Sequence, residues 1–239
     1  MRIDNNSWLL TSPIAHRGLW GGHIIENSFP AYQNAINHGY PIEIDIYQSV
    51  DGELFSFHDK TLKRMTGADG FIYEKTSKEL KELRLNNSTE TIPTLKEVLS
   101  LVDGKVPLLI EFKDQPDKTF VKNAVDILKN YKGEFAVQSF NPFIIKEIKK
   151  LAPSFIRGVL TTSTHAKEES KTVQFVLKHM PFNFLIKPDF ISCAYEDLDF
   201  VKPKSKRTPV IAWTITSSEI ENSLPPFVKN IIFEHYLAK

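Results

Sequence analysis

The sequence predicts an α/β fold, and within that class a (β/α)8 barrel formed by a single domain over residues 1–239. Three observations predict it. Short apolar segments typical of strands alternate with amphipathic segments typical of helices. Several of the strands are apolar on both faces, as buried parallel strands are. Polar residues gather where strands end, which is where barrel enzymes carry their sites. A doubly wound sheet is the alternative arrangement.

The first elements read as strand, helix, strand. A short strand within residues 12–18 follows a Ser-Pro turn signal and ends in His16, Arg17 and Gly18. A helix comes next, with Ser28 as N-cap, Pro30 in its first turn and an end at Gly39. The second strand then follows directly.

The alternation continues to the C-terminus. Two helices, at 76–83 and 94–102, each open with a capping box in which a Thr is followed three residues later by a Glu. Further helices are predicted at 117–131, 142–151, 168–179 and 218–224. Strands are predicted at 41–46, 54–57, 106–113, 135–140, 155–160, 190–192, 210–215 and 230–233. With the first strand these make nine candidates for eight barrel positions, so one must lie outside the barrel, and the sequence does not say which.

The overall composition argues against several classes of protein. A net charge of +1 gives no strong field for nucleic acid or an anionic membrane. The single cysteine, Cys193, allows no intrachain disulfide and favours an intracellular protein. No apolar run has the length of a membrane span, and no signal-peptide core is visible. We therefore expect a cytoplasmic location, a small-molecule partner, no nucleic acid and no stable membrane insertion; the sequence gives no oligomeric state.

The strand at 41–46 carries a candidate metal site. Glu43 and Asp45 are two positions apart, so both side chains point to one face of the strand, opposite three isoleucines. Two neighbouring carboxylates repel each other unless a cation neutralises them or one keeps its proton. A hard divalent cation is the ordinary solution. A solvated outer face is the alternative reading of the same pattern.

Other strand ends add acid/base and cationic groups to this pair. Glu111 and Lys113 are again two positions apart on a strand, and His16-Arg17 and His58 each follow a strand. Three carboxylates suit one hard cation, and arginine suits a phosphate group. Two histidines can divide the proton transfers, one removing a proton and the other giving one. The reaction class that this set predicts is metal-assisted cleavage of a phosphodiester.

The chain contains, in this order, the motifs IAHRG, Glu26-Asn27, IEIDIYQSVDG, FHDKTLKRMTG, IPTLKEVL, LIEFK, QSFNP and AWT. Taken together they resemble the glycerophosphodiester phosphodiesterases over nearly the whole chain. The resemblance implies a TIM barrel with one divalent cation, Mg²⁺ or Ca²⁺, that hydrolyses glycerophosphodiesters to sn-glycerol 3-phosphate and an alcohol. It also implies residue roles: metal ligands Glu43, Asp45 and Glu111, acid/base residues His16 and His58, and phosphate-binding residues Arg17 and Lys113.

The chain departs from the family pattern near its C-terminus. Members commonly have an Asp in a phrase like I-I-T-D-x-P, whereas this chain has Glu234 there. Whether its extra methylene lets it reach the same place is a question for the structure. The insertion that some members carry after His58-Asp59 is absent, which predicts a more open site.

Alternatives remain at this stage. The same fold could carry a different phosphodiesterase or phospholipase D-like activity, or bind phosphodiesters without cleaving them. An isomerase or aldolase could use Lys113 to form a Schiff base. Trp213 fits a core residue and a wall for the leaving alcohol equally well. We expect Glu26 and Asn27 to brace the first loop, and Asp59 to support a neighbour rather than bind an ion.

Overall fold

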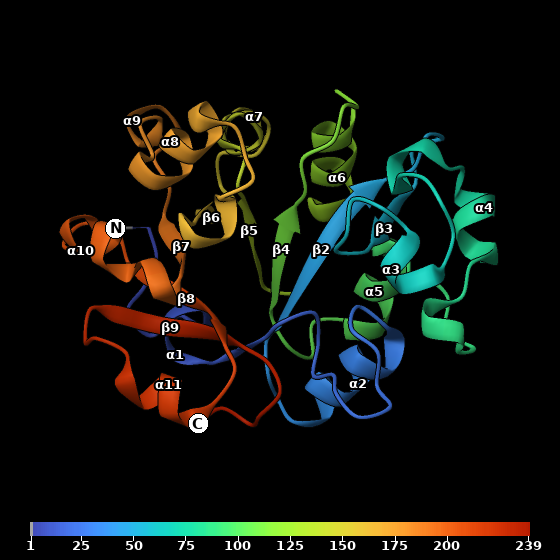
Figure 1. The fold of residues 1–239 in the computed structure, drawn as a ribbon, viewed down its shortest axis with the longest axis horizontal. Helices are drawn as coiled ribbons and strands as arrows, with labels where there is room; N and C mark the ends of the chain where they lie inside the picture. Colours follow the sequence, from blue (N-terminus) through green and yellow to red (C-terminus); the bar gives the residue numbers. More distant parts are fainter. Residues whose placement is uncertain (1) are drawn as a thin grey trace.

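The protein folds as a closed parallel barrel surrounded by helices, in a computed structural model that describes residues 2–239 (Figure 1). The wall strands pair in parallel in the order β1-β9-β8-β7-β6-β5-β4-β2, and the pairing of β1 with β2 closes the ring. This confirms the predicted fold class. The strands of the wall are β1 (Ile14–Ala15), β2 (Ile42–Gln48), β4 (Leu108–Phe112), β5 (Phe135–Ser139), β6 (Arg157–Thr161), β7 (Phe190–Ala194), β8 (Val210–Ile215) and β9 (Val228–Phe233).

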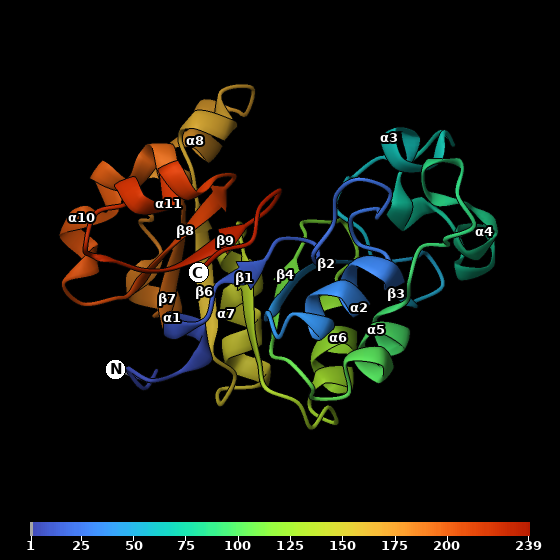
Figure 2. The same cartoon turned by 90° about the horizontal axis from the view of Figure 1, so that it is seen from below.

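The strand outside the barrel is β3 (Leu54–Ser56), which pairs antiparallel with β2. It begins an excursion, residues 49–93, that leaves the wall after β2 and lies at one side of the molecule in both views (Figures 1 and 2). The excursion has a hydrophobic cluster of its own, which includes Phe55, Phe57 and Leu62. Its short helices are α3 (Lys63–Thr66), η1 (Ile72–Glu74), α4 (Ser77–Glu82) and η2 (Leu85–Asn87).

The longer helices lie where the sequence predicts them. Thr76 and Thr94 each form both hydrogen bonds of a capping box, so local chemistry fixes where α4 and α5 begin. Ser28 caps α2 with a single hydrogen bond, because its hydroxyl oxygen accepts from the N–H of Ala31. The outer helices are α2 (Phe29–Asn37), α5 (Leu95–Val102), α6 (Phe120–Leu128), α7 (Pro142–Leu151), α8 (Lys171–His179) and α11 (Ser218–Ser223).

Several short helices have no clear signal in the sequence. The α10 segment contains Pro203 between two lysines, a composition that does not suggest a helix. The others are four residues or fewer, which is too short for a periodic pattern. They are α1 (Trp8–Thr11), η3 (Thr164–Ala166), α9 (Asn183–Ile186) and η4 (Tyr195–Asp197), with α10 at Leu198–Ser205. None of the helices within residues 2–239 has the length and apolarity that crossing a membrane requires.

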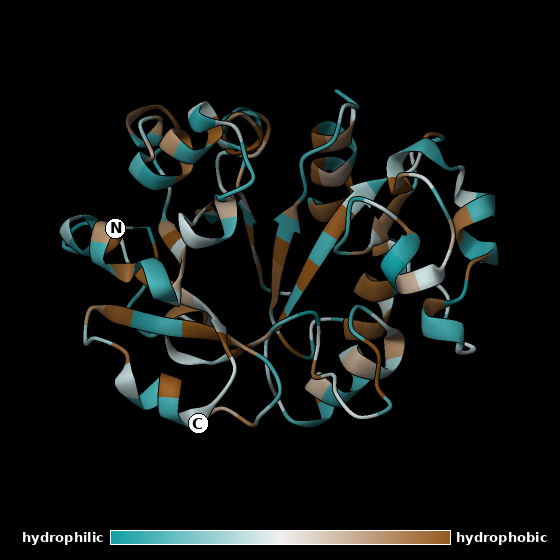
Figure 3. Ribbon diagram, viewed as in Figure 1, coloured by the Kyte–Doolittle hydropathy of each residue, from teal (hydrophilic) through white to brown (hydrophobic). Residues whose placement is uncertain are grey.

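Alternation along the wall strands separates the outer core from the barrel interior. Ile42, Ile44 and Ile46 are fully buried in the cluster between the strands and the helices, as predicted for the face opposite Glu43 and Asp45. In Figure 3 brown and teal bands alternate along β2, whereas β4 is mostly brown. A second apolar cluster fills the barrel interior beneath the polar residues. It contains residues of α1 and of several wall strands, among them Leu9, Leu10, Ile14, Leu109, Ala136, Phe190, Ile211 and Ile232.

Candidate active site

An open cavity of about 90 Å³ lies among the strand ends of the barrel. Seven of the eight residues that the sequence singles out line it, and the eighth, Asp45, is 1% exposed on the same face of β2 as Glu43. The fold therefore gathers residues that are almost 200 positions apart in the chain. The lining residues are His16, Arg17, Glu43, His58, Glu111, Lys113, Gln138, Phe140, Leu160, Trp213, Thr214 and Ile232.

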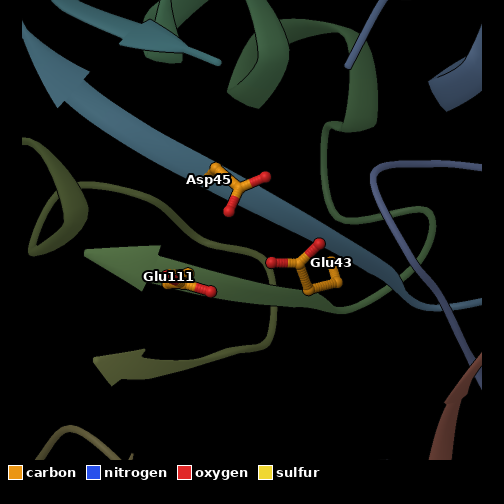
Figure 4. Close-up of side chains that lie close together, drawn as sticks. All are labelled: Glu43, Asp45 and Glu111. Atoms are coloured by element: carbon orange, nitrogen blue, oxygen red, sulfur yellow. The ribbon is translucent and has the colours of Figure 1, made fainter. Parts of the chain in front are cut away.

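Glu43, Asp45 and Glu111 form a compact group of carboxylates, which we call the acidic triad. One oxygen from each lies within 4.8 Å of the others, and all three side chains are buried. Strand register explains the grouping, because Asp45 pairs with Glu111 across β2 and β4 and Glu43 lies two residues before Asp45. Figure 4 shows the three carboxylates extending from the two adjacent strands toward one another.

The electrostatics of the triad fit a cation. Burial and the charges of Asp45 and Glu111 raise the pKa of Glu43 well above its ordinary value. Asp45 Oδ1 has no well-aligned hydrogen bond within residues 2–239, although Lys113 Nζ lies 3.2 Å away. A buried carboxylate cluster with an unsatisfied oxygen offers the donor set that hard divalent cations prefer. The acidic triad could therefore hold such an ion.

Lys113 is an ion-pair partner in this site rather than a neutral amine. Its Nζ lies 2.8 Å from Glu111 Oε1 and 3.2 Å from Asp45 Oδ1. Burial alone would lower the pKa of Lys113, but the two carboxylates outweigh burial and raise it above the ordinary value. A Schiff-base lysine needs the opposite shift, so this geometry speaks against the isomerase or aldolase reading.

The loop after β1 places His16 and Arg17 by an unusual backbone path. Arg17 has φ +58° and its N–H donates to Glu43 Oε2 at 3.0 Å. Gly18 follows with φ +85°, and a Cβ there would lie 2.9 Å from the backbone carbon of Ala31. The glycine of the His-Arg-Gly motif is therefore required both by conformation and by the close approach of α2.

His16 is oriented by the residue that departs from the family pattern. Its Nδ1 lies 2.7 Å from Glu234 Oε2, at the end of β9, and 16% of each side chain is exposed. Burial lowers the pKa of His16, while the hydrogen bond to Glu234 acts in the opposite direction. Glu234 thus reaches the site in spite of its extra methylene, which answers the question that the sequence leaves open.

His58 is held at the site from the excursion. Its Nδ1 lies 2.8 Å from Asp59 Oδ1, and Arg64 donates to both oxygens of that carboxylate. Arg64 also donates to Glu26 Oε1 at 2.6 Å, the same atom that accepts a hydrogen bond from Arg17. One ionic network therefore connects the two histidine-bearing loops, with Glu26 and Asp59 in supporting positions.

Asn27 supports the acidic triad from beneath. Its Nδ2 donates to Asp45 Oδ2 at 3.1 Å, and the fully buried Tyr32 donates its hydroxyl proton to Asn27 Oδ1 at 2.9 Å. Tyr32 Oη also lies 2.6 Å from Ser56 Oγ on β3. This chain of hydrogen bonds fixes Asp45 Oδ2, while Asp45 Oδ1 faces Lys113 Nζ at 3.2 Å.

The opposite wall of the cavity is aromatic. The Trp213 ring meets Phe140 edge to face, with ring centroids 5.7 Å apart, and His165 lies at the same centroid distance on a tilted ring. Trp213 lines the cavity and also packs against the inner apolar cluster, so it has features of both a wall and a core residue.

Sequence reasoning missed Gln138, which lines the cavity on β5. The next residue, Ser139, donates to the carbonyl oxygen of Phe112 instead of facing the site. One weak signal points to Gln138, because it lies two positions before Phe140 in the QSFNP motif and both side chains therefore point to the same face of the strand.

The model of the glycerophosphoryl diester phosphodiesterase family matches residues 16–220 of this chain. The chain belongs to this family. A glycerophosphodiester phosphodiesterase of Caldanaerobacter subterraneus subsp. tengcongensis is 33% identical over 164 residues, a match that covers 63% of this chain and 66% of that relative. This chain therefore matches slightly less than two thirds of that relative's length.

Solved structures of the family share the fold over nearly their whole length. A phosphodiesterase of Oleispira antarctica, in complex with the product sn-glycerol-3-phosphate, is 25% identical with a TM-score of 0.76, covering 94% of this chain and 93% of that chain. A glycerophosphodiester phosphodiesterase of Parabacteroides distasonis is 24% identical with a TM-score of 0.76, covering 94% of this chain and 92% of that chain.

Proposed function

We propose that this protein, as one domain over residues 1–239, hydrolyses glycerophosphodiesters to sn-glycerol 3-phosphate and an alcohol. The observation that carries the proposal is one cavity that holds two histidines beside a buried carboxylate cluster and two cationic side chains. Family membership supports it, as does the sn-glycerol-3-phosphate complex of the Oleispira antarctica relative.

In this proposal the acidic triad binds one divalent cation, Mg²⁺ or Ca²⁺. All of its ligands are carboxylate oxygens, which both ions accept, and water or substrate oxygens complete the coordination. The bound ion supplies Lewis-acid polarisation of the phosphoryl oxygen. Arg17 and Lys113 complement the charge of the phosphate group from the rim of the triad.

The two histidines carry the proton transfers. Each has its Nδ1 held by a carboxylate, Glu234 for His16 and Asp59 for His58, which leaves each Nε2 without a protein partner within residues 2–239. An imidazole fixed in this way can exchange a proton through Nε2. One histidine removes the proton of the attacking oxygen, and the other gives a proton to the leaving oxygen, with Trp213 beside the alcohol that departs.

The direct test is release of sn-glycerol 3-phosphate from glycerophosphocholine and glycerophosphoethanolamine, with and without EDTA. We expect chelation to abolish turnover and Mg²⁺ or Ca²⁺ to restore it. His16→Ala and His58→Ala should each lower kcat by about 100-fold or more. The matched control is His179→Ala, because His179 is exposed on α8 and does not line the cavity. Turnover that ignores EDTA, or normal kcat in both histidine variants, would contradict the proposal.

A further inference from the structure

Gln138 is a buried amide whose orientation is fixed from one side only. Its side chain lies on the floor of the cavity and the residue is 1% exposed. The hydroxyl of Ser192, on β7, donates to Gln138 Oε1 at 2.7 Å, and Ser192 is fully buried. No group within residues 2–239 accepts a hydrogen bond from Nε2, and Nε2 is not among the enclosed polar atoms that lack a partner, so this amino group faces the open cavity. A donor in that position can bind a water molecule or an oxygen of a ligand.

The barrel architecture shows why these two residues meet across an intervening strand. Gln138 pairs with Gly158 of β6, and Ser192 pairs with Leu160 two residues further along that strand. Gly158 has no side chain, and a Cβ there would lie 2.2 Å from the ring of Phe190. Phe190 thus fills the space over the glycine, and the Gln138–Ser192 hydrogen bond spans β6 between its two strand neighbours.

The register also aligns Gln138 with the acidic triad. Asp45 pairs with Glu111, and Glu111 pairs with Gln138, so three adjacent strands carry a carboxylate, a carboxylate and an amide at one level. Phe140, two residues after Gln138, belongs to the aromatic wall. The amide therefore lies between the triad and that wall.

The charged side chains near the triad contact carboxylates. Lys113 contacts Glu111 and Asp45, and Arg17 contacts Glu26. Gln138 Nε2 differs from them because it is neutral and unpaired within residues 2–239, and it differs from the neutral, unpaired Trp213 Nε1 because that atom is enclosed by protein atoms. Such a donor suits an oxygen acceptor of a ligand, and it adds no charge to a site that must bind both a cation and a phosphate.

We propose that Gln138 Nε2 donates a hydrogen bond to an oxygen of the sn-glycerol 3-phosphate moiety of the substrate, and that Ser192 is its positioning residue. The inference rests on the proposed function, because that function names the moiety. The acceptor is either a phosphate oxygen or a glycerol hydroxyl. The two cases predict different effects of Gln138 substitutions on the affinity of the protein for inorganic phosphate.

The test compares Gln138→Leu and Gln138→Met with the unaltered full-length protein, in the presence of Mg²⁺. We measure kcat and KM for glycerophosphocholine, and the Kd of sn-glycerol 3-phosphate and of inorganic phosphate by calorimetry. Both variants should raise KM, and the Kd of glycerol 3-phosphate, by about 10- to 100-fold with little change in kcat, as loss of a hydrogen bond that exists before the reaction predicts. If the variants also bind inorganic phosphate more weakly, the acceptor is a phosphate oxygen. If their binding of inorganic phosphate is unchanged, the acceptor is a glycerol hydroxyl.

Ser192→Ala tests the positioning role. It should raise KM by about 3- to 10-fold, because the amide is still present but is free to turn. In a Gln138→Leu background the same change should add nothing further, since the two residues act through one hydrogen bond. The matched control is Ser139→Ala on the same strand, which removes a buried hydrogen bond to Phe112 that does not face the cavity and should leave KM unchanged.

The outcomes separate this inference from the proposed function. Normal KM and normal Kd in both folded Gln138 variants would overturn the inference and leave the activity in place. Absence of turnover in the unaltered protein would overturn the proposed function, while the calorimetric Kd values would still decide whether Gln138 contacts the ligand. Additive effects of Ser192→Ala and Gln138→Leu on KM would refute the positioning role.

Discussion

Replacing Glu234 by Gln isolates the charge that faces His16. Glu234 Oε2 lies 2.7 Å from His16 Nδ1, and a glutamine oxygen can accept the same hydrogen bond at almost the same place. The variant therefore keeps the orientation of the imidazole and loses only the carboxylate charge. That charge stabilises the imidazolium that forms when His16 takes up a proton.

The expected loss follows from the kind of hydrogen bond. A hydrogen bond to a charged group contributes about 1.5–3 kcal/mol and a neutral one about 0.5–1.5 kcal/mol. The difference of about 1–1.5 kcal/mol corresponds to a decrease in kcat of about 5- to 15-fold. Glu234→Ala removes the hydrogen bond altogether, so its kcat should fall further, by up to about 100-fold.

The pH profile adds a readout that a loss of packing would not change. The hydrogen bond to Glu234 raises the pKa of His16 against the effect of burial, so removing the charge lowers that pKa. The limb of the kcat/KM profile that His16 controls should therefore move to lower pH, whether His16 acts as base or as acid. His235→Gln is the control, because His235 lies 3.4 Å from Glu234 Oε1 and is 46% exposed. An unshifted profile together with normal kcat would refute the role of Glu234.

Three further predictions address the ion site, the ionic network and the buried hydrogen bonds. Because burial and its carboxylate neighbours raise the pKa of Glu43 above its ordinary 4.5, the metal-free protein loses stability as pH rises from 4.5 toward neutrality. In EDTA at pH 7, Glu43→Gln should raise the Tm of the protein by about 2–4 °C, which is the shift that a stabilisation of about 1 kcal/mol gives in a protein of this size. Below pH 4.5 this increase in Tm should vanish. An unchanged Tm at pH 7 would contradict the prediction. Arg64→Ala removes the ion-pair partner of both Asp59 and Glu26, so kcat/KM should fall by about 10-fold. The control Lys63→Ala breaks only an exposed ion pair, so its kcat/KM should stay within about twofold of the unaltered protein. Equal effects of the two substitutions would argue against the network. Tyr32→Phe removes two short buried hydrogen bonds and leaves Asn27 Oδ1 and Ser56 Oγ with only their mutual hydrogen bond of 3.3 Å. It should lower the free energy of unfolding in urea by about 1–3 kcal/mol, and an unchanged value would mean that the mutual bond compensates fully.

The sequence predicts the barrel and most of the candidate site because their signals are local. The i, i+2 spacing places Glu43 with Asp45, and Glu111 with Lys113, on the inner faces of two strands. The capping boxes at Thr76 and Thr94 need only four consecutive residues to form. In both cases the information lies within one element, so no knowledge of tertiary contacts is needed.

What the sequence could not supply depends on pairing between distant segments. The antiparallel pairing of β3 with β2 puts it outside the wall, and nothing in its composition distinguishes it from a barrel strand. Gln138 depends on strand register and on Ser192, which is 54 residues away. The reach of Glu234 to His16 depends on where the two ends of the chain meet, at β1 and β9.

The separate hydrophobic cluster of the excursion has a consequence for inactivation by heat. His16 directly follows the wall strand β1, whereas His58 follows β3 in the excursion, which packs around its own small hydrophobic cluster. Regions with independent packing can open while the rest of a protein stays folded. Thermal loss of turnover should therefore precede the cooperative melting of the barrel, and rapid cooling should restore activity without refolding of the wall.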